Sequence, residues 1–195
     1  MTHFSPLTRR RLLMSIPLIG AMGIGFSFWK MLTDMSAGTF NSHDINTPIL
    51  NRPVPYFTLP GVIPQQGFSS TELKHLNTPV LVIFFASWCI PCLEEMPILL
   101  SLKNFLPLWG IAYKDSPYNV KEFLHNSGNP FTRLAEDRHG LVGIDWGISG
   151  VPESFLIGAG GIIRWHNPNP LTEETMTHIL LPLVKKYHHE IFYSF

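Results

Sequence analysis

Apolar runs alternate along the chain with polar, helix-like segments, and this alternation predicts an α/β domain. The runs at 80–86 and 108–113 carry no charged side chain and are as short as the buried strands of a central sheet. The glycine-rich residues 158–161 predict the turn of a hairpin. Strands are therefore expected at 80–86 and 108–113, with shorter ones at 56–59, 131–135, 153–157 and 162–166.

Helix signals fall between these strands. Ser69 and Glu72 fit a capping box that opens a short helix reaching about Leu76. We expect further helices after the motif at 89–92, with a kink at Pro97, and from 115–117 to about His125, at 141–146, and from a Thr172 cap to about Lys186. The order β-α-β-α-β-α-β-β-α, with an extra short strand in front, predicts an α/β sandwich around a mixed sheet.

Both cysteines of the chain lie in one motif, Cys89-Ile90-Pro91-Cys92, directly after the apolar run at 80–86. Residues 93–96 predict the first turns of a helix, which places Cys89 at a helix N-terminus. Unpaired N–H groups and the positive end of the helix dipole favour the thiolate there, and the thiolate is the nucleophilic form. Cys92 lies one turn further on, so the motif predicts reversible dithiol–disulfide exchange.

Two other uses of this cysteine pair are less favoured. A structural zinc site needs four ligands, and no second Cys-x-x-Cys or His-x₃-His with suitable spacing is apparent. A purely structural disulfide would close a very short loop and would remove little entropy from the unfolded chain. We expect no metal, and we expect His139, His166 and the pair His188-His189 to be surface residues.

The N-terminal segment has the features of a membrane anchor. Arg9-Arg10-Arg11 precede a stretch from Leu12 to Trp29 without charged residues, which as a helix would be roughly 27 Å long and just enough to cross a bilayer core. Trp29 and Lys30 stand where interfacial anchors belong. The arginines should stay in the cytoplasm, so we expect residues 12–32 to be an uncleaved signal anchor.

Alternatives to an anchor are a cleaved signal peptide, a twin-arginine export signal and a buried soluble helix. Ser36-Ala37-Gly38 is a poor cleavage site, and the basic cluster argues against a soluble helix. The twin-arginine interpretation of residues 8–13 stays open.

Composition agrees with one membrane-anchored domain. Hydrophobic residues make up 45% of the chain and charged residues 14%, and the N-terminal stretch supplies part of this excess. The formal net charge of +0 suggests no nucleic-acid partner. We expect a cytoplasmic N-terminus (1–11), the anchor in membrane lipid (12–32), a tether (33–49) and an extracytoplasmic α/β domain (50–195).

The chain resembles a known family over residues from about Arg52 to Tyr187. Trp88 and the cysteine motif after a long strand are similar to the thioredoxin fold. Residues 110–115 (GIAYKD), 128–131 (GNPF), 146–157 (WGISGVPESFLI) and 161–163 (GII) resemble the membrane-anchored thiol:disulfide interchange proteins of cytochrome c maturation, the DsbE/CcmG type. The resemblance implies a single-pass protein of the bacterial inner membrane with its thioredoxin-like domain on the periplasmic side.

The resemblance also implies the roles of particular residues. Cys89 would be the attacking thiol and Cys92 the resolving thiol, with no other cofactor than their disulfide. Pro152 would be a cis-proline facing the disulfide, and the backbone of Val151 would pair with the substrate. Glu95 and Glu153 would line an acidic groove, and Trp88 would shield Cys89, also contacting substrate. On composition alone, both glutamates would be solvated charges and Trp88 a half-buried core aromatic.

The chain departs from the family pattern at a few positions. Ile83 stands where soluble thioredoxins carry a buried aspartate, so the proton of the resolving thiol would need another base, either Glu95 or water. Gly158 replaces an acidic residue, and the glycine of the closing His-x-Gly stretch is missing from residues 166–169.

The function that the resemblance implies is reduction of apocytochrome c haem-motif disulfides, or of mixed disulfides with maturation partners. With no second cysteine pair and no dinucleotide fingerprint, the chain would depend on a membrane thiol transporter as electron donor. A generic extracytoplasmic disulfide oxidoreductase is the nearest alternative. A thiol peroxidase motif is missing at residues 85–88, and a copper-delivery protein of this fold would want cysteines one residue further apart.

Overall fold

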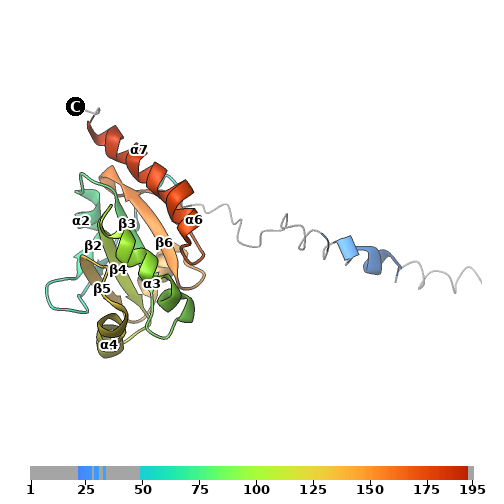
Figure 1. Cartoon of the computed structure of the whole chain (residues 1–195), viewed down its shortest axis with the longest axis horizontal. Coiled ribbons are helices and arrows are strands. Elements are labelled where there is room, and N and C mark those ends of the chain that lie inside the picture. Colours follow the sequence, from blue (N-terminus) through green and yellow to red (C-terminus); the bar gives the residue numbers. More distant parts are fainter. Residues whose placement is uncertain (1–21, 28, 31–32, 34–48, 193–195) are drawn as a thin grey trace, which may run out of the picture. The chain divides into compact units, whose positions relative to one another are not determined.

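The computed structural model in Figure 1 describes residues 22–27, 29–30, 33 and 49–192. The chain divides into two compact units, residues 1–46 and 47–195. Within the described part of the chain, no helix combines the length and the apolar character needed to cross a membrane. The predicted basic N-terminus (1–11) lies outside the described residues, as do most of the anchor (12–32) and of the tether (33–49).

The second unit is built on a five-stranded sheet in the order β5-β4-β3-β6-β7. Its strands are β3 (Val80–Phe85), β4 (Leu108–Tyr113), β5 (Arg133–Asp137), β6 (Glu153–Gly158) and β7 (Ile162–Asn167). β4 pairs in parallel with both β3 and β5. β6 pairs antiparallel with both β3 and β7, so the predicted mixed sheet and its closing hairpin are confirmed. A separate two-stranded sheet joins β1 (Thr58–Leu59) to β2 (Phe68–Ser69), and β2 was not predicted.

The strand expected at 131–135 begins two residues later, at Arg133. The backbone N–H of Phe131 donates to the side chain of Asn129, 2.9 Å away, and this turn delays the entry of the chain into the ladder.

The predicted helices are present as α2 (Ser70–Lys74), α3 (Ile90–Leu102), α4 (Pro117–Ser127) and α5 (Leu141–Trp146). Ser69 and Glu72 form the expected capping box. Helix α3 includes Pro97. The single helix expected after Thr172 is instead three consecutive pieces, α6 (Glu173–Thr175), the π-helical η2 (Met176–Leu180) and α7 (Leu181–Phe192).

Buried strand β3 separates two apolar clusters, because its side chains alternate between the faces of the sheet. Leu81, Ile83 and Phe85 pack with α3, α4 and α7 on one face. Val82 and Phe84 pack with α2 and α5 on the other face. Figure 1 shows α3 lying across the sheet, and a short loop (86–89) joins the end of β3 to its N-terminus. This sandwich places the cysteine motif at the carboxyl end of the central strand.

Candidate active site

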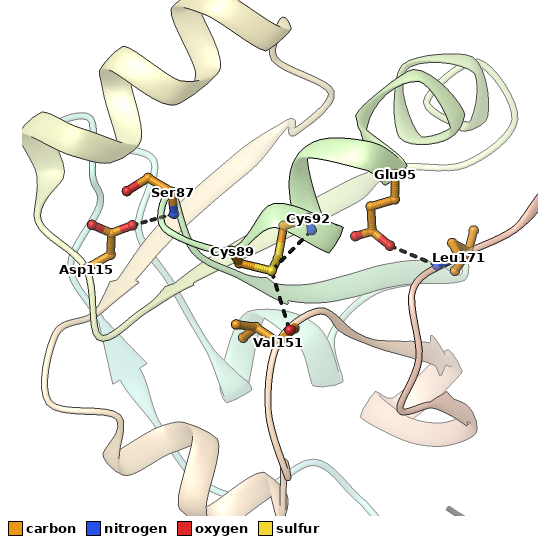
Figure 2. The surroundings of a disulfide bond; sticks show 7 residues. All are labelled: Ser87, Cys89, Cys92, Glu95, Asp115, Val151 and Leu171. Carbon is orange, nitrogen blue, oxygen red and sulfur yellow. Dashed lines mark hydrogen bonds between the residues drawn. A yellow bond between two sulfur atoms is a disulfide. The ribbon is translucent and has the colours of Figure 1, made fainter.

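A disulfide joins Cys89 and Cys92 at the N-terminus of α3 (Figure 2). Cys89 is the N-cap residue, and its Sγ accepts a hydrogen bond from the backbone N–H of Cys92 at 3.1 Å. Cys89 is 5% exposed and Cys92 only 1%. An N–H aimed at Cys89 Sγ would stabilise its thiolate in the reduced protein, whereas Cys92 is enclosed.

The loop before Cys89 is fixed from the end of β4. The Ser87 backbone N–H donates to Asp115 Oδ2 at 2.6 Å (Figure 2). The Ser116 N–H donates to Asp115 Oδ1 at 2.7 Å. The Trp88 indole N–H donates to the Lys114 carbonyl oxygen at 3.4 Å. The Asp115 carboxylate is buried and accepts hydrogen bonds from both of these backbone N–H groups, a role that the sequence analysis did not predict. Its signals in the sequence were its place in the helix start at 115–117 and in the family run 110–115.

Trp88 is not the half-buried core residue that composition suggested, because 59% of it is exposed. Ile90, which lies between the two cysteines, and Leu93, which follows Cys92, are also exposed. The disulfide thus lies next to apolar side chains that are open to a partner.

Val151 faces the disulfide from the loop before β6. Its carbonyl oxygen lies 3.4 Å from Cys89 Sγ (Figure 2), and the Val151–Pro152 bond is cis, as the resemblance implied. Pro152 is buried and Val151 half-buried. The structure therefore brings Cys89, Cys92, Val151 and Pro152 together, although they come from segments about 60 residues apart.

Glu95 is a buried carboxyl group on α3, not the solvated charge that composition suggested. It is 2% exposed, and its Oε2 accepts a hydrogen bond from the Leu171 backbone N–H at 2.8 Å (Figure 2). Its Oε1 is buried and has no hydrogen-bond partner among the described residues. Burial raises the pKa of Glu95 to about 7, and the Leu171 hydrogen bond offsets this only in part. Ile83 lies in the same apolar cluster as both cysteines and supplies no base.

Glu153, at the start of β6, is also buried and not solvated. Its Oε1 accepts hydrogen bonds from the Ser149 N–H, the Ser149 hydroxyl and the Gly150 N–H, and its Oε2 lies 2.7 Å from His166 Nε2. Burial raises the pKa of Glu153, but the bonds from His166, Ser149 and Gly150 outweigh it, so the pKa is lowered. The expectation that His166 is a surface residue is wrong, because its side chain is 7% exposed.

Among the described residues, no group of three or more His, Cys, Asp or Glu side chains is placed to hold a metal ion. The polar groups described at the site are the cysteine pair, the backbone of Val151 and the three buried carboxyl groups of Glu95, Asp115 and Glu153.

Comparison with known proteins agrees with this geometry. Residues 50–166 match the model of the AhpC/TSA family. A thiol:disulfide interchange protein DsbE of Xylella fastidiosa is 31% identical over 183 residues, which cover 92% of this chain and 91% of the relative. The thiol:disulfide interchange protein HelX of Rhodobacter capsulatus is 34% identical over 176 residues, covering 88% and 95%.

Solved structures share the fold. The crystal structure of a thiol:disulfide interchange protein of the thioredoxin family from Chlorobium tepidum superposes with a TM-score of 0.52 at 28% identity, over 70% of this chain and 95% of that one. The chain belongs to the AhpC/TSA family and, with its thioredoxin-like sheet and Cys89–Cys92 pair, to the DsbE-type thiol:disulfide interchange proteins, which are disulfide oxidoreductases.

Proposed function

We propose that this oxidoreductase works as a reductant in cytochrome c maturation, and that its substrates are apocytochrome c haem-motif disulfides or mixed disulfides with maturation partners. The observation that carries the proposal is the position of Cys89 Sγ at the N-terminus of α3, 3.4 Å from the Val151 carbonyl oxygen. An extended peptide can bind to such a backbone group while its disulfide meets Cys89. Exposed Trp88 beside Cys89 offers an apolar contact to the same peptide.

The reaction is two successive thiol–disulfide exchanges. The Cys89 thiolate attacks one sulfur of the substrate disulfide, forming a mixed disulfide, and the second substrate sulfur leaves as a thiolate and takes up a proton. The Cys92 thiolate then attacks Cys89 Sγ, which releases the first substrate sulfur. The substrate gains two electrons and two protons, and the enzyme ends the reaction in the oxidised state, with a Cys89–Cys92 disulfide.

We assign Glu95 as the base that accepts the proton of the Cys92 thiol. Cys92 is enclosed and must lose its proton before it attacks, and Glu95 follows it by three residues on the same face of α3. A carboxyl group with a pKa of about 7 can accept a proton near neutral pH and return it. Water is the alternative carrier of this proton.

The oxidised enzyme needs an outside reductant, because Cys89 and Cys92 are the only cysteines of the chain. A membrane thiol transporter would fill this role in an oxidising compartment. The basic residues 9–11 and the apolar residues 12–29 support an anchor in the bacterial inner membrane with the domain on its periplasmic side.

A trapping experiment tests the proposal. Reduced Cys92→Ser protein should form a stable mixed disulfide with an oxidised Cys-x-x-Cys-His peptide, and Cys89→Ser protein should form none. The wild-type protein should reduce the peptide completely, with a reduction potential nearer the about −270 mV of thioredoxin than the about −120 mV of a strong periplasmic oxidant. A potential at the oxidising end, with net oxidation of the dithiol peptide, would instead make it a disulfide oxidase.

A further inference from the structure

The loop that presents the Val151 carbonyl is held by a buried acid. Glu153 receives three hydrogen bonds from Ser149 and Gly150, at 2.6, 2.7 and 3.0 Å. These two residues precede Val151 directly, so the Glu153 carboxylate fixes the chain immediately before Val151. The Val151 carbonyl faces Cys89 (Figure 2). The position of the Val151 carbonyl therefore depends on the Glu153 side chain, which holds the loop through Ser149 and Gly150.

Glu153 lies on the sheet face opposite to α3. Glu153 and Phe155 are two residues apart on β6, so their side chains share a face. Phe155 belongs to the apolar cluster formed with α2 and α5, whereas both cysteines belong to the cluster formed with α3. Glu153 therefore acts on the disulfide side through the backbone of the loop.

His166 completes this arrangement from β7. It stands directly across from Phe155 in the strand register, and the two rings stack at 4.3 Å with an interplanar angle of 13°. Glu153 is the diagonal neighbour of His166, and their side chains meet at 2.7 Å. A carboxylate as buried as this one needs a full set of donors, and His166 supplies the donor that the loop does not.

We propose that His166 is a positioning residue of the redox site: by holding the Glu153 carboxylate it orders Ser149 and Gly150, and so fixes the Val151 carbonyl for a substrate peptide. This rests on the proposed function, because it takes Val151 to be the acceptor for substrate backbone.

The test compares two substitutions at this position. His166→Phe keeps a stacked aromatic ring and removes both ring nitrogens, including the Nε2 that meets Glu153, whereas His166→Gln can place an amide N–H near the Glu153 carboxylate. Two substrates are used, an oxidised Cys-x-x-Cys-His peptide and 5,5′-dithiobis(2-nitrobenzoate), a small disulfide without a peptide backbone. His139→Phe, at an exposed histidine, is the matched control.

We expect His166→Phe to raise KM for the peptide about tenfold, the loss of roughly one hydrogen bond, with kcat little changed. Its rate with the small disulfide should stay within about twofold of wild type, and His166→Gln should recover most of the peptide KM. An unchanged KM in His166→Phe would overturn the proposal, as would equal losses on both substrates in both variants, which indicate general loss of packing.

Should His166→Phe fail to fold, Glu153→Gln replaces it, with the same expected rise in KM and the same refuting result. Failure of the wild-type protein to reduce the peptide at all would reject the proposed function, so the two failures are distinguishable.

Discussion

The buried carboxyl group of Glu95 should make the protein less stable as the pH rises. Its pKa is raised from 4.5 to about 7 in the folded protein, mainly by burial. The folded state therefore binds a proton that the unfolded state has already released, and the free energy of unfolding falls between pH 4.5 and about 7. Each unit of pKa difference between the folded and unfolded states corresponds to about 1.4 kcal/mol. The raised pKa of Glu95 therefore lowers the free energy of unfolding by about 3 kcal/mol at pH 8.

Replacing Glu95 by Gln should remove this penalty. A glutamine has the shape of the protonated acid, and its oxygen can still accept the hydrogen bond from the Leu171 N–H. We expect Glu95→Gln to match the wild-type protein at pH 4 and to be up to about 3 kcal/mol more stable at pH 8. The neighbouring Glu94, which is exposed, offers the matched control Glu94→Gln, for which we expect little change at either pH.

Urea unfolding of the oxidised proteins at pH 4, 6 and 8 measures the effect, since the disulfide prevents the cysteines from titrating. Other groups, Glu153 among them, also titrate, so the informative quantity is the difference between variant and wild type at each pH. A difference that does not grow with pH, or a Glu95→Gln protein that is less stable at pH 8, would refute the reasoning. If Glu95 serves the proton of Cys92, the stabilised variant should also exchange disulfides more slowly.

Three further outcomes are expected. Alkylation of the reduced protein near neutral pH should label Cys89 before Cys92, because only Cys89 lies at the helix N-terminus; preferential labelling of Cys92 would reverse their roles. Asp115→Asn should lower the free energy of unfolding by about 1–3 kcal/mol, because the single amide oxygen can accept from only one of the two capped N–H groups, and thermal unfolding beside Asp145→Asn, at an exposed aspartate, would show it. Residues 12–29 should remain in a membrane-bound mature protein, and N-terminal sequencing that finds a soluble chain beginning near Gly38 would contradict the anchor.

Local patterns predicted the parts of the fold that depend on neighbouring residues. The apolar run of β3, the Ser69–Glu72 capping box and the helix after the cysteine motif could all be predicted because the residues that form them are adjacent in the sequence. The two-residue strand β2 is too short to show a period.

The environments of the acids could not be predicted in this way. Glu95 receives a hydrogen bond from a residue 76 positions later, and Glu153 meets His166 only once β6 and β7 pair. Nothing in the spacing of charged residues distinguishes such groups from solvated ones. The resemblance to a family pointed to both glutamates, but only the tertiary contacts show that one has a raised pKa and the other a lowered one.

The distances in sequence that separate the parts of the site also bear on how the chain matures. The contacts of the site span 28, 62 and 76 residues, so the thiols emerge during synthesis well before Val151 and Leu171 can cover them. An early, half-made domain would therefore expose Cys89 and Cys92 to any oxidant. Because the chain has no third cysteine, oxidation within one molecule at that stage can form only the native Cys89–Cys92 pair. A disulfide that forms early therefore does not have to be rearranged later.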